Sequence, residues 1–389
     1  MAVRRIPCPN NDSLTEGQRI LRPAARGSSV LRNGQGPRSI LCAATAVMLI
    51  SSCGNARDDV TSGVTPSLTV TGTGTTEFQG VHHAAQSPID GSLYVLDAMG
   101  LHKFASTGEY VTSHDVSNIA RTDPRSGLSF TWAPDGSLVL RDHAGYFRLD
   151  GNDPMLPMRT PPEGGTGPPY VPRFRPDGCA VEFRNRLGEV DGERLPWLVD
   201  AVVRCLEGVT IDSTSLPIAW TVRLPNSNRT PPPMSNGPVL DMDSFGRYWF
   251  AERRGYTLLA LSPEGDTLLR HEMDATPRTM PYTERKRWAD EWTDLFEVSP
   301  ESVPTTETIV RRVVACSDGE RVLVFPRTKD VAEGTAVDVF QWEEYLGRFH
   351  FSEPLRLLHH HPECRGNQVT GSTMGPDGGE RVVVFRLPL

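Results

Sequence analysis

The side chains in this sequence that are best suited to binding a metal are its clustered histidines. His359, His360 and His361 are consecutive, and His82 and His83 lie in a segment that we expect to be an inner β-strand. Imidazole nitrogens are common ligands of zinc. Because neighbouring residues of an extended chain point to opposite sides, three consecutive histidines do not bring three nitrogens onto one ion. We therefore expect an ordinary loop at the triplet, and neither a metal nor a cofactor in the protein.

Motifs of common enzyme classes are missing from the sequence. Gly371-Ser372-Thr373-Met374-Gly375 places its serine outside the position that a nucleophile elbow requires. The sequence also has no HExxH zinc motif, no Walker loop and no dinucleotide fingerprint. We therefore expect no catalytic residues.

Four cysteines downstream of residue 53 could form disulfide bonds in an exported protein. They are Cys179, Cys205, Cys316 and Cys364, and four cysteines allow three pairings. Cys179 and Cys205 fall within one unit of the repeat described below, so this pair is our first expectation. Four free buried thiols are the alternative.

The N-terminal region has the features of an export signal. The apolar run Ile40–Ile50 follows several arginines and has eleven residues, whereas a membrane-spanning helix needs about 20. This length is typical of a signal-peptide core. The run ends in Leu49-Ile50-Ser51-Ser52-Cys53, which resembles the bacterial lipobox. The Cys53 thiol is then the nucleophile that takes a diacylglyceryl group, and a plain secretory signal is the alternative.

Lipidation at Cys53 would make residues 1–52 a leader and residues 53–66 a flexible tether, since the latter are polar and rich in Ser, Thr and Gly. Each buried CH₂ contributes about 0.8 kcal/mol, so several acyl chains anchor a protein durably. We expect a protein exported to the bacterial cell envelope and held at a membrane by its lipid. Gly54 in place of aspartate favours the outer over the inner membrane.

Composition favours an all-β fold that does not bind nucleic acid. Glycine (35) and proline (33) make up about 17% of the 389 residues, above the usual share of roughly 12%, and they are spread between short β-rich runs. Seven arginines and two acids give residues 1–52 a charge of +5. The net charge of the whole chain is −8, so the remaining residues carry −13. A domain that is so acidic repels phosphate backbones.

Six Asp-Gly turns divide the chain, and Asp241–Arg270, with Pro238–Met242 in front, shows one complete unit as a four-stranded antiparallel meander. Each turn is followed by a short apolar run: Asp90-Gly91, Asp135-Gly136, Asp177-Gly178, Asp243 to Gly246, Asp318-Gly319 and Asp377-Gly378. Glycine accepts a positive φ and aspartate hydrogen-bonds within its own turn, so the dipeptide favours hairpins. The turn explains each acid, and we expect no calcium there.

The last unit is incomplete, which predicts a closed ring. It holds only Gln368–Met374 and Glu380–Leu387, while Leu68–Thr71 and Thr75–Phe78 have no partner. We expect the N-terminal strand to pair beside Glu380–Leu387 and close a six-bladed β-propeller over residues 67–389. A β-sandwich would explain the strand density but not the sixfold turns.

Two insertions interrupt the repeat. Residues 225–238 are rich in Pro and Asn and predict an exposed loop. Thr283–Phe296 predicts one short helix, capped by Thr283, with Trp288 and Trp292 on one face. We expect the tryptophans to pack on the propeller, with a ligand-binding lid as the alternative.

The sequence resembles the NHL and TolB-like group. The resemblance lies in the Asp-Gly strands, the hairpin Leu261-Ser262-Pro263-Glu264-Gly265, the helical insertion and the closing strand Glu380–Leu387. Members of this group are six-bladed propellers that occur as secreted proteins and lipoproteins in bacteria. The resemblance covers residues 67–389 and implies a fold that hosts binding modules, scaffolds and some hydrolases.

The resulting functional hypothesis is a lipid-anchored propeller that binds a protein, peptide or glycan ligand at its central funnel or top loops. An envelope scaffold without small ligands is a related reading. The alternative is a hydrolase or lactonase with a metal in the central channel.

Overall fold

The computed structural model describes residues 63–116, 128–141, 146–149, 156–159, 171, 173–187, 194–205, 211–223, 239–252, 255–273, 275–292, 299–301, 303, 305–327, 334–357 and 361–389. The predicted leader, Cys53 and the loop 225–238 lie outside these residues. Contacts divide the chain after Arg57, and every described residue belongs to the second part. Among the residues that are described, no helix is long and apolar enough to cross a membrane.

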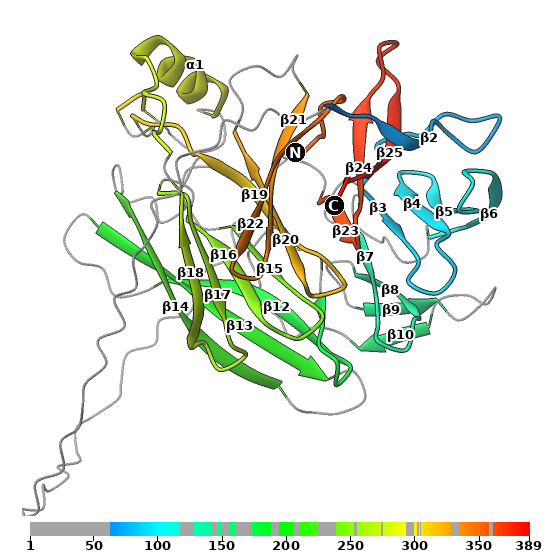
Figure 1. The fold of residues 1–389 in the computed structure, drawn as a ribbon, viewed down its shortest axis with the longest axis horizontal. Helices are drawn as coiled ribbons and strands as arrows, with labels where there is room; N and C mark the ends of the chain where they lie inside the picture. The colour runs from blue at the N-terminus through cyan, green and yellow to red at the C-terminus, as the bar shows by residue number, and fades with distance from the viewer. Residues whose placement is uncertain are drawn as a thin grey trace, which may run out of the picture. The chain divides into compact units, whose positions relative to one another are not determined.

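The structure is a six-bladed β-propeller, as the turn repeat predicts (Figure 1). Blade one contains β3 (His83–Gln86), β4 (Leu93–Asp97), β5 (Gly100–Phe104) and β6 (Tyr110–His114). Blade two contains β7 (Ser129–Trp132), β8 (Leu138–Arg141), β9 (Tyr146–Leu149) and β10 (Leu156–Arg159). Blade three contains β11 (Arg173–Phe174), β12 (Cys179–Leu187), β13 (Arg194–Cys205) and β14 (Ile211–Arg223). Blade four contains β15 (Val239–Met242), β16 (Tyr248–Ala251), β17 (Thr257–Leu261) and β18 (Thr267–Glu272). Blade five contains β19 (Val310–Ala315), β20 (Arg321–Pro326), β21 (Thr335–Gln341) and β22 (Glu344–Phe351). Blade six contains β23 (Glu363–Arg365), β24 (Gln368–Met374), β25 (Glu380–Arg386) and β2 (Pro66–Val70).

The six Asp-Gly turns share one geometry. In each, the aspartate accepts a hydrogen bond from the backbone N–H two residues later, at 2.9–3.2 Å. The glycine of each turn has φ between 70° and 81°, a region in which a side chain would be strained. The chemistry of the dipeptide therefore sets these reversals, which is why the repeat is readable in the sequence.

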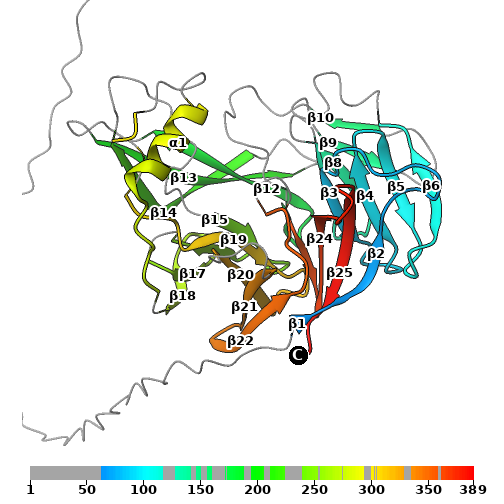
Figure 2. The ribbon, with the colours of Figure 1, turned by 90° about the horizontal axis from the view of Figure 1, so that it is seen from above.

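The two ends of the described chain complete the ring, as expected. Strand β2 lies antiparallel to β25, with Val70 opposite Val382, and the two strands are side by side in both views (Figures 1 and 2). Ordered structure also begins earlier than residue 67. Strand β1 (Gly63–Val64) runs parallel to β22 at the outer edge of blade five, within the range expected to be a tether. Buried Val64 packs into the core between blades five and six, which explains the earlier start.

Blade six differs from its expected composition. Only one strand comes from the N-terminus, because within residues 75–78 only Glu77 and Phe78 pair, and each forms an isolated bridge. The other is β23, which lies just upstream of β24 and outside the turn repeat. The Asp377-Gly378 turn therefore joins β24 to β25, whereas the other five turns join the first and second strands of a blade. Blade six thus has β23 as the innermost of its four strands.

The helix is also present but packs differently from the prediction. Helix α1 spans Tyr282–Trp292, so Thr283 lies inside its first turn and does not cap it. Trp288 packs against Met280 and Val303, which belong to the segments flanking the helix rather than to a blade. The Trp292 side chain and residues 293–298 lie outside the described residues.

Candidate functional site

The innermost strands bring one arginine between two carboxylates on the propeller axis. Arg173 of β11 donates from Nε and Nη2 to the two carboxylate oxygens of Asp241 in β15, at 2.7 and 3.0 Å. Its Nη1 donates to both oxygens of Glu363 in β23, at 2.7 and 2.9 Å. The three side chains are only 12%, 4% and 14% exposed. We call Arg173, Asp241 and Glu363 the axial triad.

His83 joins the axial triad to blades one and two. Its Nε2 lies 3.0 Å from Glu363 Oε1, and its Nδ1 accepts a hydrogen bond from the Phe130 N–H at 3.3 Å. Because Nδ1 is an acceptor, the proton is on Nε2 and the ring is neutral. A histidine in a catalytic triad uses its second nitrogen to activate a hydroxyl. In His83 that nitrogen is occupied by an amide, so the Glu363–His83 pair has no nucleophile.

Backbone groups complete the arrangement at Asp241. The carboxylate accepts hydrogen bonds from the N–H groups of Met242 and Ala315, both at 2.9 Å. Ala315 ends β19, so each of the six blades contributes a group to the axis. The triad is therefore held by the whole ring rather than by one hairpin.

The charges around the triad set its protonation states. Burial alone would raise the pKa of Glu363, but Arg173 and the hydrogen bond from His83 lower it to about 2. The pKa of His361 is lowered to about 4, mainly by burial and further by the positive charge of Arg312, although the Asp241 carboxylate acts to raise it. The His361 Nδ1 donates to the Pro362 carbonyl at 2.8 Å. At neutral pH Glu363 is ionised and His361 is neutral, so neither is a proton donor with a pKa suited to acid catalysis.

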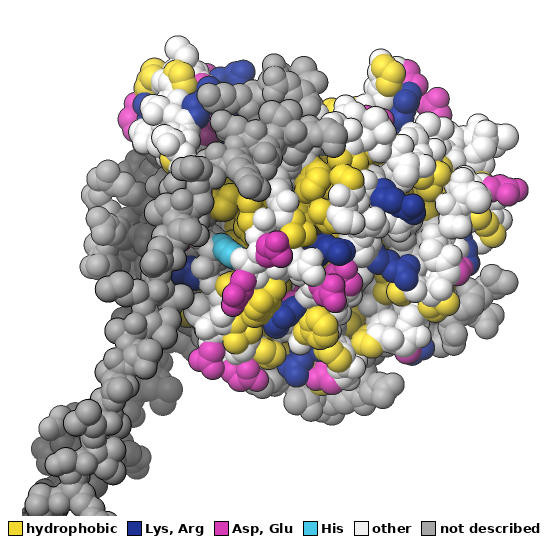
Figure 3. Space-filling model, viewed as in Figure 1, with side chains coloured by type: hydrophobic (Ala, Val, Ile, Leu, Met, Phe, Trp, Pro, Cys, Tyr) yellow, Lys and Arg dark blue, Asp and Glu magenta, His cyan; other side chains and the backbone are white. Residues whose placement is uncertain are grey.

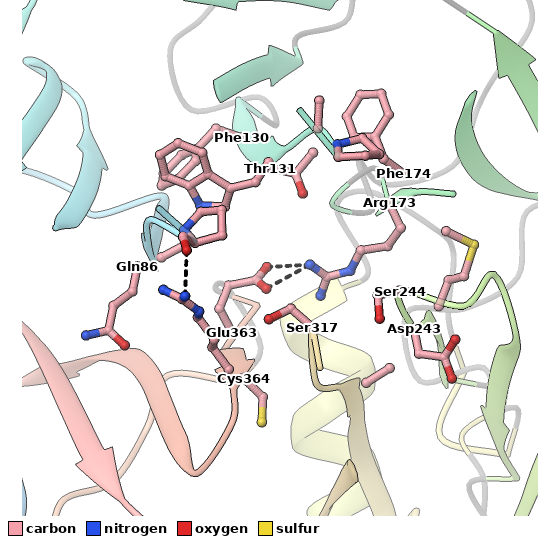
Figure 4. A pocket seen from close by; sticks show the side chains of 18 of the residues that line it. Gln86, Phe130, Thr131, Arg173, Phe174, Asp243, Ser244, Ser317, Glu363 and Cys364 are labelled. Atoms are coloured by element: carbon pink, nitrogen blue, oxygen red, sulfur yellow. Dashed lines mark hydrogen bonds and ion pairs between the residues drawn. The ribbon is translucent and has the colours of Figure 1, made fainter. Parts of the chain in front are cut away.

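A pocket of about 380 Å³ opens on the axis beside the triad. All six blades line it, mostly at the ends of their first strands, and Arg173 and Glu363 are among its residues. Figure 4 shows the Glu363 carboxylate pointing at the Arg173 guanidinium, with Ser317 beside the pair. The partly buried Trp132 and the exposed Pro134 and Pro176 supply apolar wall. The pocket therefore combines a charged inner end with an apolar mouth.

Arg365 supplies a second guanidinium to the wall. Its Nη2 donates to the Pro88 carbonyl at 2.6 Å, and its Nη1 donates to the Ser87 carbonyl. These bonds join blade six to the first turn of blade one and fix the orientation of the cation.

The cysteines form two disulfides. Cys179 is bonded to Cys205, the pair expected from the sequence, and it joins β12 to β13 within blade three. Cys316 is bonded to Cys364 and joins blade five to blade six beside the pocket.

The histidines are divided by the structure. His83 belongs to the axial network, and His361, expected in an ordinary loop, is buried with its Nε2 3.9 Å from Asp241 Oδ2. His359 and His360 lie outside the described residues. Among the residues that are described, no group of three or more His, Cys, Asp or Glu could hold a metal ion.

Sequence reasoning missed the axial triad. Arg173 lies just before the Asp177-Gly178 turn and Asp241 just before the turn from Asp243 to Gly246, and a charged residue in the short run before such a turn was the available signal. Glu363 had no such signal, because β23 lies outside the repeat.

The face seen in Figure 3 carries basic and acidic side chains interspersed with apolar ones. The part of this face that is described shows no extended basic patch of the kind that binds nucleic acid.

The comparisons with known proteins concern the fold. No model of a protein family matches the chain, and no curated protein matches it. Virginiamycin B lyase from Staphylococcus aureus is 13% identical with a TM-score of 0.42, over 80% of this chain and 97% of that one. A protein described as a putative gluconolactonase is 12% identical with a TM-score of 0.42, over 83% and 94%. Regucalcin from Agrobacterium tumefaciens, described as a calcium-binding protein, is 11% identical with a TM-score of 0.37, over 84% and 97%. These likenesses are to the propeller alone.

Proposed function

We propose that this protein is an exported, lipid-anchored propeller that binds a ligand in its axial pocket. The observation that carries the proposal is the pocket itself, where two guanidinium groups, two carboxylates and apolar side chains converge from six blades. Sites for small ligands are concave and mostly apolar, with a few placed polar groups. The ligand is a small molecule, or a group of a protein, peptide or glycan that reaches into the pocket.

Two observations favour binding over catalysis. The Glu363 carboxylate is ionised and already held by Arg173 and His83. A histidine that acts as a base needs a nitrogen without a hydrogen-bond donor, and the Nδ1 of His83 already accepts a hydrogen bond from the Phe130 N–H. These groups are arranged to hold charge in place rather than to transfer protons.

The envelope location is supported by the sequence and the cysteines together. The Cys53 lipobox and the resemblance to NHL and TolB-like lipoproteins favour a lipid anchor. Two disulfides are typical of proteins that fold in an oxidising compartment such as the periplasm.

The test is a thermal-shift screen of residues 58–389 with a defined panel of amino acids, dipeptides, organic acids, monosaccharides and disaccharides. Ser317 is exposed at the pocket, so Ser317→Trp should fill the pocket. Ser106 is exposed in a turn of blade one and does not line the pocket, so Ser106→Trp is the matched control. We expect at least one compound to raise the Tm of wild type and of Ser106→Trp but not of Ser317→Trp.

A panel in which no compound binds, or in which binding survives Ser317→Trp, would overturn the axial site. Hydrolysis of glucono-δ-lactone with and without Ca²⁺, measured in parallel, tests the lactonase alternative. We expect no turnover above buffer.

A further inference from the structure

We propose that the axial pocket takes a small zwitterion with an apolar side chain, namely a free amino acid or a short peptide. Its ammonium group binds at Glu363, its carboxylate binds at Arg365, and its side chain lies against Trp132. This inference rests on the proposed function and specifies the ligand of the same pocket.

The two charged groups come from one strand. Glu363 and Arg365 are two residues apart in β23, so their side chains leave the same face of the strand, with Cα atoms about 7 Å apart. Both line the pocket. The Cys364–Cys316 disulfide and the hydrogen bond from the Ser317 N–H to the Cys364 carbonyl, at 2.9 Å, hold the strand between them. A negative and a positive group are thus presented to the pocket at a fixed separation.

The inner end of the pocket presents the Glu363 carboxylate. In the axial triad the Arg173 guanidinium is shared between the carboxylates of Asp241 and Glu363. The other contact to Glu363 comes from His83 Nε2. Glu363 is 14% exposed, and a carboxylate has about four acceptor sites, so it retains capacity for an ammonium group.

A second part of the pocket wall presents the Arg365 guanidinium. Arg365 uses both Nη groups on the carbonyls of Ser87 and Pro88. Carbonyls orient the guanidinium without neutralising it, and the structure gives it no ion pair with any described carboxylate. A ligand carboxylate pairs with Arg365, and a ligand ammonium group pairs with Glu363. A ligand with only one of the two charges makes only one of these contacts.

The remaining wall suits an apolar side chain. Trp132 is partly buried, and Pro134 and Pro176 are exposed at the pocket. The volume of about 380 Å³ lies at the lower end of the range for small-molecule sites, roughly 300–1,000 Å³. This size favours one or two residues over a long peptide or an oligosaccharide.

Calorimetry with four forms of one side chain tests the charge pattern on wild-type protein. The probes are L-phenylalanine, L-phenylalaninamide, N-acetyl-L-phenylalanine and N-acetyl-L-phenylalaninamide, together with the same four forms of alanyl-phenylalanine. We expect the zwitterion of one series to bind at least 10-fold more tightly than either singly capped form. The series in which this occurs decides between an amino acid and a dipeptide.

Two variants assign the charges to residues. Glu363→Gln should make the zwitterion and its N-acetyl form bind equally, and Arg365→Gln should make the zwitterion and its amide bind equally. Equal binding of all four forms by wild type, or no binding of either zwitterion, would overturn the inference. If a sugar or organic acid binds and Ser317→Trp abolishes it, the axial site stands and only the zwitterion is wrong.

Discussion

Arg173 and Glu363 are 190 residues apart in the chain, yet Arg173 Nη1 lies 2.7 Å from a Glu363 carboxylate oxygen on the propeller axis. Through the same guanidinium Asp241 is also bound, so a single side chain links blades three, four and six. The ring is therefore held at its centre as well as at its outer edge.

Replacing Arg173 by methionine should leave two carboxylates buried without their cation. Breaking a buried pair in this way costs about 3–5 kcal/mol, measured as the free energy of unfolding in urea. The triple variant with Arg173→Met, Asp241→Asn and Glu363→Gln should recover most of the loss. Arg175→Ala is the control, because its ion pair with Asp177 is partly exposed and should contribute less than about 1 kcal/mol. Equal losses in Arg173→Met and Arg175→Ala would contradict the account.

His361 should make stability fall as the pH is lowered from neutral. Its pKa is about 4 in the folded protein, against an ordinary value of 6.5. Between these values the unfolded chain binds the proton more readily, so the stability is complete above pH 6.5 and is lost as the pH falls towards 4. The expected loss is about 3 kcal/mol. Glu363, with a folded pKa of about 2, adds a further loss only below its ordinary 4.5.

Denaturation curves at pH 7, 6, 5 and 4 measure this loss. His361→Asn, whose amide can still donate to the Pro362 carbonyl, should flatten the curve between pH 6.5 and 4. His350→Gln, on an outer strand of blade five, should leave it unchanged. A pH profile that is identical in His361→Asn and wild type would exclude His361 as its source.

Pairing of β2 with β25 should be needed for a stable ring. Val70 is buried against blade one, whereas the adjacent Thr69 is exposed. Val70→Asp places an unpaired charge in the core, which should lower the unfolding free energy by about 3 kcal/mol or more. The freed edge of β25 should also increase aggregation. Thr69→Asp should stay within about 0.5 kcal/mol of wild type. Similar Tm values for the two variants would argue against closure by this strand.

Both disulfides should stabilise the fold by comparable amounts. They enclose sequence separations of 26 and 48 residues, for which the chain-entropy model gives about 3.5 and about 4 kcal/mol. Paired Cys→Ala variants measured in urea test these values. We also expect the Cys316→Ala/Cys364→Ala protein to lose ligand affinity, because that bridge lies beside the pocket. The Cys179→Ala/Cys205→Ala protein, altered within blade three, should retain it.

The lipid anchor is tested by the intact mass of the protein purified from membranes of a bacterial host. We expect a chain that begins at Cys53 and carries acyl groups, with four fewer hydrogens than the reduced form because of its two disulfides. Cys53→Ala should remain uncleaved and unacylated. A mature chain that begins elsewhere and lacks lipid would favour the plain secretory signal.

The sequence was informative where local chemistry sets the structure and silent where it does not. Asp90, Asp135 and their counterparts make the same contact in every turn, so each turn is recognisable from two residues, and six of them predict the blade count. Strand β23 has three residues and no such turn, so neither it nor Glu363 could be predicted. The axial triad depends on the angular positions of blades three, four and six around the axis, which no short stretch of sequence encodes. Cys179 and Cys205 were predictable as a pair because one repeat unit contains both.

The ribosome makes Ser67 long before Val384, the residue 317 positions later whose carbonyl accepts a hydrogen bond from the Ser67 hydroxyl. Strand β2 therefore has no partner until almost the whole polypeptide has been released, whereas the earlier blades can form in the order of their synthesis. A message truncated anywhere before β25 would yield a protein that keeps an open edge, and such an edge is what chaperones and quality-control proteases act upon. In this architecture a premature stop near the C-terminus is equivalent to deleting the first strand.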